Sequence, residues 1–185
     1  MLDRIRLLVL DVDGVLTDGR IVYDSAGAEI KAFSAADGQG VKYWLRAGHQ
    51  AAILTGRESE TIGRRAEELG IGLVRTGVKD KLPVFEELLQ EAGCAAGETC
   101  AVGDDLPDLP LLARAGLAVA VPAAPEAVRR LAHYVTRAEG GAGAVRETVE
   151  LLLAYQDRWR DVTRRYEDRL PPRLPEVRRP WRARP

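Results

Sequence analysis

The chain has 185 residues, of which 46% are hydrophobic and 30% charged, so it is long enough to bury one sizeable core. Its 27 basic and 28 acidic residues leave a net charge of −1, which gives no indication of nucleic-acid or membrane binding. Two cysteines are too few for a disulfide framework, and no apolar run is long enough to span a bilayer, so we expect a cytoplasmic protein.

Short apolar runs alternate with helix-forming segments along most of the chain. We expect buried strands at residues 5–10, 50–54, 72–74, 99–102, 117–121 and 133–135. We expect helices at residues 37–48, with Asp37 as the cap, and at 58–69, 80–92, 105–113, 125–131 and 144–159. This alternation predicts an α/β fold, a Rossmann-like parallel sheet with helices on both faces.

Two segments depart from the alternation. Residues 20–23 and 29–33 are rich in strand formers and flank a turn, which predicts a β-hairpin inserted after the first strand. Beyond residue 160 the composition shifts to Arg and Pro with little apolar content. We therefore expect a domain at residues 1–160 and a tail at 161–185, for which disorder is favoured over a docking arm.

Polar residues follow three of the predicted strands, where ligands of parallel sheets bind. The first strand leads into residues 11–17, which begin Asp-Val-Asp-Gly, the second into residues 55–57 and the fourth into residues 103–108. Lys81 begins an intervening helix. Carboxylates without His or Cys suit Mg²⁺. One carboxylate can attack phosphorus and a second can protonate the leaving oxygen, so the pattern predicts phosphoryl transfer.

Each motif taken alone has an ordinary explanation. Asp11-Val-Asp13-Gly14 could begin a calcium loop, but the glycine is misplaced and Val22 stands where a glutamate is needed. Thr55 and Lys81 could be a turn residue and a solvated lysine, which their order after Asp11 argues against. Arg57 could pair with neighbouring glutamates instead of an anionic ligand. The glycine-rich residues 140–143 could be a simple helix-entry loop, but so much glycine indicates that this backbone closely approaches another group.

In their order, residues 11–17, Thr55, Lys81 and residues 103–108 resemble the four motifs of the haloacid dehalogenase superfamily of phosphatases. The resemblance implies that Asp11 is the nucleophile and Asp13 the general acid and base, while Thr55 and Lys81 hold the phosphoryl group. It implies that Mg²⁺ binds Asp11, the backbone carbonyl of Asp13, and Asp104. Asp105 and Asp108 are left to position either Lys81 or metal-bound water.

A closer resemblance, over residues 5–158, is to the 3-deoxy-D-manno-octulosonate 8-phosphate (KDO 8-phosphate) phosphatases. The segments that show this resemblance are residues 11–19, 31–33, 37–38, 55–57, 103–106 and 140–147. It implies a small sugar phosphate as substrate, a role in lipopolysaccharide synthesis and no separate cap domain. It also implies a homotetramer in which the hairpin and the tail help to cover a neighbouring subunit's site. Matches to substrate contacts are Asp13, Ser34, Asp37, Gly38, Lys42, Gly56, Arg57, Arg65 and Lys81.

Two departures leave the exact sugar acid open. Ala142 stands where these relatives have a basic residue, and Lys42 where they have arginine. A nonulosonate (sialic-acid-type) 9-phosphate is therefore an alternative substrate. A binding or assembly protein that kept the fold and lost activity is a different class, against which the intact Asp11, Asp13 and Lys81 argue.

Overall fold

A six-stranded parallel sheet forms the centre of the computed structural model, which describes residues 2–168. The strand order is β5-β4-β1-β6-β7-β8, and all neighbouring strands are parallel. The strands are β1 (Leu7–Leu10), β4 (Gln50–Leu54), β5 (Leu73–Arg75), β6 (Thr99–Gly103), β7 (Leu117–Ala120) and β8 (Tyr134–Val135). The central strands β1 and β6 are buried along their whole length, as apolar runs covered on both faces should be.

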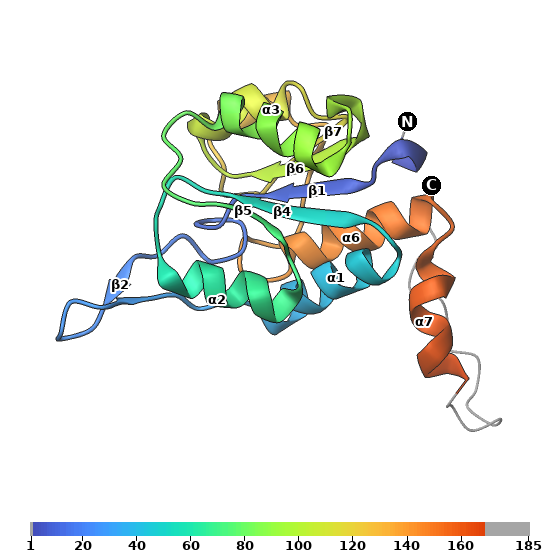
Figure 1. Ribbon diagram of the computed structural model, residues 1–185, viewed down its shortest axis with the longest axis horizontal. Coiled ribbons are helices and arrows are strands. Elements are labelled where there is room, and N and C mark those ends of the chain that lie inside the picture. The colour runs from blue at the N-terminus through green and yellow to red at the C-terminus, as the bar shows by residue number, and fades with distance from the viewer. Residues whose placement is uncertain (1, 169–185) are drawn as a thin grey trace.

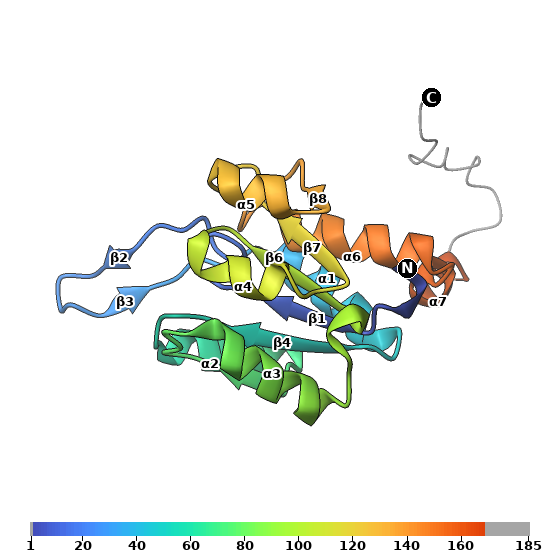
Figure 2. The ribbon, with the colours of Figure 1, turned by 90° about the horizontal axis from the view of Figure 1, so that it is seen from above.

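Helices cover both faces of this sheet (Figure 1). One face carries α1 (Ala35–Arg46), α2 (Glu60–Leu69) and α6 (Ala144–Tyr155). The other carries α3 (Lys81–Ala92), α4 (Leu109–Leu112) and α5 (Glu126–Leu131), as the view from above also shows (Figure 2). The predicted α/β fold with a doubly covered parallel sheet is confirmed.

A β-hairpin leaves the sheet after β1 and projects from the body of the molecule (Figures 1 and 2). Its strands, β2 (Val22–Tyr23) and β3 (Glu29–Ile30), are antiparallel, with Val22 opposite Ile30. The predicted hairpin is confirmed, although its strands are shorter than expected. Between β1 and α1 the chain forms no element other than this hairpin, so no separate cap domain stands there.

The start of α1 differs from the prediction. Asp37 was expected to cap this helix, but Ser34 occupies the N-cap position and its Oγ accepts a hydrogen bond from the Asp37 backbone N–H at 3.2 Å. A serine side chain can satisfy a free N–H of the first turn as well as an aspartate can. Asp37 therefore lies inside the first turn, where its carboxylate makes other contacts.

The end of the described chain also differs from the prediction. The single helix expected at residues 144–159 is two helices, because α6 ends at Tyr155 and α7 spans Trp159–Glu167. Between them Asp157 has a positive φ of 56°, which a right-handed helix cannot accommodate. The expected boundary at residue 160 falls inside α7, where Val162 is buried. The first part of the predicted disordered tail is therefore helical. The rest of it, residues 169–185, lies outside the described residues.

No helix within residues 2–168 combines the length and the apolar character needed to cross a membrane. Trp44 and both cysteines, Cys94 and Cys100, are buried. The loops after β1, β4 and β6 meet at the carboxyl edge of the sheet, next to the point where the hairpin leaves it (Figure 1). Three of the four predicted motifs lie in these loops, and the remaining one, Lys81, begins α3.

Candidate active site

A cavity of about 360 Å³ opens between the loops that follow β1, β4 and β6. Most residues that the motifs predicted line it: Asp11, Asp13, Thr55, Gly56, Arg57, Lys81 and Asp104. Its remaining lining residues are Val78, Lys79, Asp105, Pro107 and Asp108. Three strand ends and the start of α3 therefore deliver carboxylates, a hydroxyl and cations to one place, as the topology of a parallel sheet predicts.

The loop after β1 is held tightly against its neighbours by two glycines. Gly14 has a positive φ of 96°, and a Cβ there would lie 2.1 Å from Asp104 Oδ2. Gly140 lies so close that a Cβ would be 1.7 Å from the carbonyl oxygen of Gly14. The predicted close approach of the glycine-rich segment is therefore confirmed, and its partner is the loop that carries Asp11 and Asp13.

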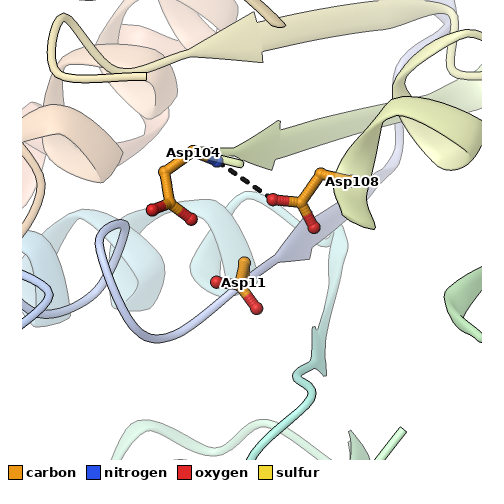
Figure 3. Close-up of side chains that lie close together, drawn as sticks. All are labelled: Asp11, Asp104 and Asp108. Atoms are coloured by element: carbon orange, nitrogen blue, oxygen red, sulfur yellow. Dashed lines mark hydrogen bonds between the residues drawn. The ribbon is translucent and has the colours of Figure 1, made fainter. Parts of the chain in front are cut away.

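Three carboxylates turn toward one another in the cavity (Figure 3). Asp11 follows β1, while Asp104 and Asp108 follow β6, and each offers an oxygen within 4.8 Å of the others. Both oxygens of Asp108 already accept hydrogen bonds, Oδ1 from Lys81 Nζ at 2.6 Å and Oδ2 from the backbone N–H of Asp104 at 3.0 Å. Asp11 and Asp104 are therefore the side chains that could hold a metal ion directly, and their role as ligands stays a prediction.

The burial and crowding of these carboxylates raise the pKa values of Asp104 and Asp11. Burial raises the pKa of Asp104 to about 8, and the neighbouring charges of Asp11 and Asp108 act in the same direction. Burial likewise raises the pKa of Asp11. Acids arranged in this way favour the presence of a cation, and a set of oxygen donors without nitrogen or sulfur fits Mg²⁺.

Lys81 stands at the start of α3 with only 5% of its side chain exposed. Its Nζ donates to Asp11 Oδ1 at 2.7 Å as well as to Asp108. Burial alone would lower the pKa of Lys81, but the two carboxylates outweigh it and raise that pKa. Lys81 is therefore a fixed positive charge beside the predicted nucleophile. The sequence left open whether Asp108 positions Lys81 or metal-bound water, and this contact shows that Asp108 holds Lys81.

Asp13 faces a group of charges that the motifs did not predict. Its Oδ1 accepts a hydrogen bond from Lys31 Nζ, and its Oδ2 lies 3.7 Å from Arg57 Nε. Glu29 Oε1 lies 3.4 Å from Lys31 Nζ and accepts a hydrogen bond from Arg57 Nη2 at 2.7 Å. Arg57 thus pairs with Glu29 of the hairpin, and not with the glutamates next to it in sequence. Lys31 belongs to a segment that resembled the family, which was the one signal available for it.

Thr55 and Gly56 form the turn after β4. The Thr55 side chain is buried, and its Oγ1 accepts a hydrogen bond from the Arg57 backbone N–H at 3.4 Å. A hydroxyl and free backbone N–H groups at such a turn can bind phosphoryl oxygens.

Five predicted substrate contacts do not line this cavity in the single chain: Ser34, Asp37, Gly38, Lys42 and Arg65. Asp37 is buried, and its carboxylate accepts hydrogen bonds from the backbone N–H groups of Gly143 and Arg146, so it caps the start of α6. Lys42 is exposed on α1. Arg65 donates to the Ser34 carbonyl at 3.2 Å, and its guanidinium fills the space beside Gly38.

Curated proteins with sequences similar to this chain include phosphatases. The haloacid dehalogenase-like hydrolase family matches residues 73–146. The 3-deoxy-D-manno-octulosonate 8-phosphate phosphatase KdsC of Yersinia pestis is 43% identical over 159 residues, which cover 86% of this chain and 85% of that protein. KdsC of Escherichia coli K12 is 44% identical over 154 residues, covering 83% of this chain and 82% of that protein.

A solved structure is similar as well. The Moraxella catarrhalis 3-deoxy-D-manno-octulosonate 8-phosphate phosphatase, crystallised with a magnesium ion, a phosphate ion and KDO, is 40% identical with a TM-score of 0.87. The match covers 89% of this chain and 95% of that one.

Proposed function

The chain belongs to the family of 3-deoxy-D-manno-octulosonate 8-phosphate phosphatases among the haloacid dehalogenase-like hydrolases, and we propose that it hydrolyses KDO 8-phosphate to KDO and phosphate with Mg²⁺ as its cofactor. As a member it is a phosphoric monoester hydrolase. The observation that carries the proposal is the meeting of Asp11, Asp104 and Lys81 in one cavity, with Asp13 two residues after Asp11. We further propose that this reaction serves lipopolysaccharide synthesis.

The first half-reaction transfers the phosphoryl group to the enzyme. An Asp11 oxygen attacks phosphorus while the bond to the sugar oxygen breaks, which leaves an aspartyl phosphate. Asp13 gives its proton to the departing oxygen. Lys81, the Thr55 hydroxyl and the Gly56 backbone N–H hold the phosphoryl oxygens. Mg²⁺, when bound by Asp11, Asp104 and the carbonyl of Asp13, would neutralise the phosphoryl charge.

The second half-reaction returns the enzyme to its starting state. Asp13, now ionised, takes a proton from a water molecule as that water attacks phosphorus. The bond between phosphorus and Asp11 breaks, phosphate leaves, and both aspartates regain their original protonation. Lys81 enters the reaction charged, because Asp11 and Asp108 raise its pKa.

Substrate choice is proposed to rest on Arg57. It lines the cavity beside the phosphate site, and a planar guanidinium can bind a carboxylate through two hydrogen bonds. A phosphorylated sugar acid offers such a carboxylate. Because Arg57 pairs with Glu29 at 2.7 Å, the substrate must compete with that glutamate. Assaying KDO 8-phosphate beside a nonulosonate 9-phosphate tests the choice, and a preference for the second would favour the alternative substrate.

We also propose that the protein is a cytoplasmic homotetramer. Support for assembly comes from the hairpin, whose Ile21, Val22, Tyr23 and Ile30 are each more than 40% exposed. Apolar side chains gathered on a short hairpin favour contact with another chain. In such an assembly we propose that Ser34, Lys42 and Arg65, which do not line their own cavity, act at the cavity of a neighbouring subunit, whereas Gly38 is buried beside Arg65. The free, buried cysteines favour a reducing compartment.

A further inference from the structure

Four side chains form a closed ring of alternating charge at the base of the hairpin. In order around the ring they are Asp13, Lys31, Glu29 and Arg57. Asp13 comes from the loop after β1, Arg57 from the loop after β4, and the other two from β3 and the residue that follows it. The ring therefore joins the hairpin directly to the carboxylate proposed as general acid and base.

Lys31 is the buried member of the ring. Only 1% of its side chain is exposed, whereas residues 21–28 of the same hairpin are all exposed. Burying a lysine costs free energy unless carboxylates compensate its charge, and Asp13 and Glu29 both do so here. An exposed ion pair would anchor the hairpin with a smaller desolvation free energy. The burial of Lys31 therefore indicates that this lysine acts on Asp13 and does more than anchor the hairpin.

The contacts of Asp13 define that task. Lys31 occupies Oδ1, while Oδ2 is shielded from solvent and has no hydrogen-bond partner among the described residues. Oδ1 is thus held in place, while Oδ2 faces the Arg57 guanidinium at 3.7 Å without a hydrogen bond between them. A general acid needs this arrangement, because its reactive oxygen must be fixed in direction yet available to the substrate.

We infer that Lys31 is a positioning residue for Asp13, which it orients for proton transfer to the leaving oxygen, and that Glu29 holds Lys31 in this position. The inference rests on the proposed function, in which Asp13 donates that proton. In the step concerned, the proton moves from Asp13 Oδ2 to the sugar oxygen as the bond between that oxygen and phosphorus breaks and the bond from Asp11 forms.

The test compares two leaving groups in the first half-reaction. The alkoxide of a sugar phosphate needs the proton, whereas the phenolate of p-nitrophenyl phosphate leaves well without it. With enzyme in excess, a single turnover reports leaving-group release before water attacks the phosphorus of the aspartyl phosphate. Lys31→Met should slow release of KDO on the order of 10²-fold, the cost of a misplaced reactive group, and slow nitrophenol release by only about threefold or less.

Matched variants separate positioning from folding. Lys31→Arg should recover much of the lost rate, because it keeps a cation near Asp13. Arg130→Met removes a cation that pairs with Glu126 on α5 and does not line the cavity, and it should change neither rate. If Lys31→Met does not fold, Glu29→Gln keeps the lysine and removes its second carboxylate. It should show the same dependence on leaving group with a smaller loss.

Equal slowing of both substrates in Lys31→Met, or in Glu29→Gln where the first variant does not fold, would overturn the inference and leave Lys31 as a hairpin anchor. Unchanged rates would overturn it too. Asp13→Asn distinguishes this from failure of the proposed mechanism, because it should show the dependence on leaving group most strongly. If Asp13→Asn slows both substrates equally, the general-acid assignment is wrong and the inference falls with it. If the wild-type enzyme releases no KDO, the proposed substrate is wrong, but the inference can still be tested. A neutral alkyl phosphate that the enzyme does hydrolyse then replaces KDO 8-phosphate in the comparison with p-nitrophenyl phosphate.

Discussion

Asp108 accepts a hydrogen bond from Lys81 at 2.6 Å, and both side chains are buried although one stands at the start of α3 and the other follows β6. The absence of a side chain at Gly103 leaves room for Asp108, since a Cβ at residue 103 would lie 2.6 Å from Asp108 Oδ2. The Asp108 carboxylate therefore fixes the position of the cation beside Asp11 without needing to touch the substrate.

Replacing Asp108 tests this relationship. Asp108→Asn removes a charge that holds Lys81, and we expect kcat/KM to fall by about 10- to 100-fold, the usual cost of losing a partner that orients a ligand. Glu86→Gln is the matched control, because Glu86 lies on α3 together with Lys81 and makes only a long, exposed ion pair with Arg114 at 3.8 Å. A full-rate Asp108→Asn enzyme would show that Lys81 needs no such support.

The nucleophile has its own test. Asp11→Asn should abolish turnover, because an amide neither attacks phosphorus well nor binds a metal strongly. Asp13→Asn should lower kcat by roughly two to four orders of magnitude, the range for loss of general acid catalysis. Circular dichroism should show both variants folded. Near-normal turnover by Asp11→Asn would mean that another group attacks phosphorus.

Metal binding should depend on pH through Asp104. Because burial and the adjacent carboxylates raise the pKa of Asp104 to about 8, a proton competes with Mg²⁺ below that pH. The apparent affinity for Mg²⁺ should therefore rise with pH and level off above about 8. Titrations of Mg²⁺ at several pH values, followed by calorimetry, measure this.

Chelation should abolish activity and added Mg²⁺ restore it, and Asp104→Asn should weaken binding. Full activity in excess chelator would contradict a metal requirement.

The sheet and the centre of the site could be predicted because they depend on short-range patterns. Strand β4 has the predicted bounds, since an apolar run between polar turns admits few other structures. Asp11, Thr55 and Asp104 meet because parallel strands end at the same edge of a sheet. Lys81 joins them because α3 begins close to that edge.

The ring around Asp13 and the break after α6 could not be predicted in the same way. Lys31 and Glu29 reach Asp13 only because the returning strand of the hairpin brings its base beside the loop after β1, and nothing in the local sequence specifies that direction. The break depends on Asp157, whose positive φ redirects the chain so that Trp159 packs edge-on against Tyr43 with ring centroids 5.9 Å apart. That packing is a tertiary contact, which helix propensity does not encode.

Assembly should depend on the exposed hairpin residues. Sedimentation at micromolar concentration should show a tetramer for the wild type. Ile30→Asp places a charge on a side chain that is 51% exposed in the single chain, and we expect it to shift the population toward smaller species. Glu126→Gln, which alters an exposed ion pair on α5, should leave the tetramer intact. An active monomer of the wild type would contradict the proposed assembly.

The most direct test of a sugar-acid phosphate substrate compares kcat/KM for KDO 8-phosphate and for a neutral sugar phosphate, in the wild type and in Arg57→Ala. The wild type should prefer KDO 8-phosphate. Loss of Arg57 should cost about 1.5–3 kcal/mol of transition-state binding for that substrate, the range for a hydrogen bond to a charged group, and much less for the neutral one. Equal preference in the wild type, or an equal effect of Arg57→Ala on both substrates, would contradict recognition of a sugar acid.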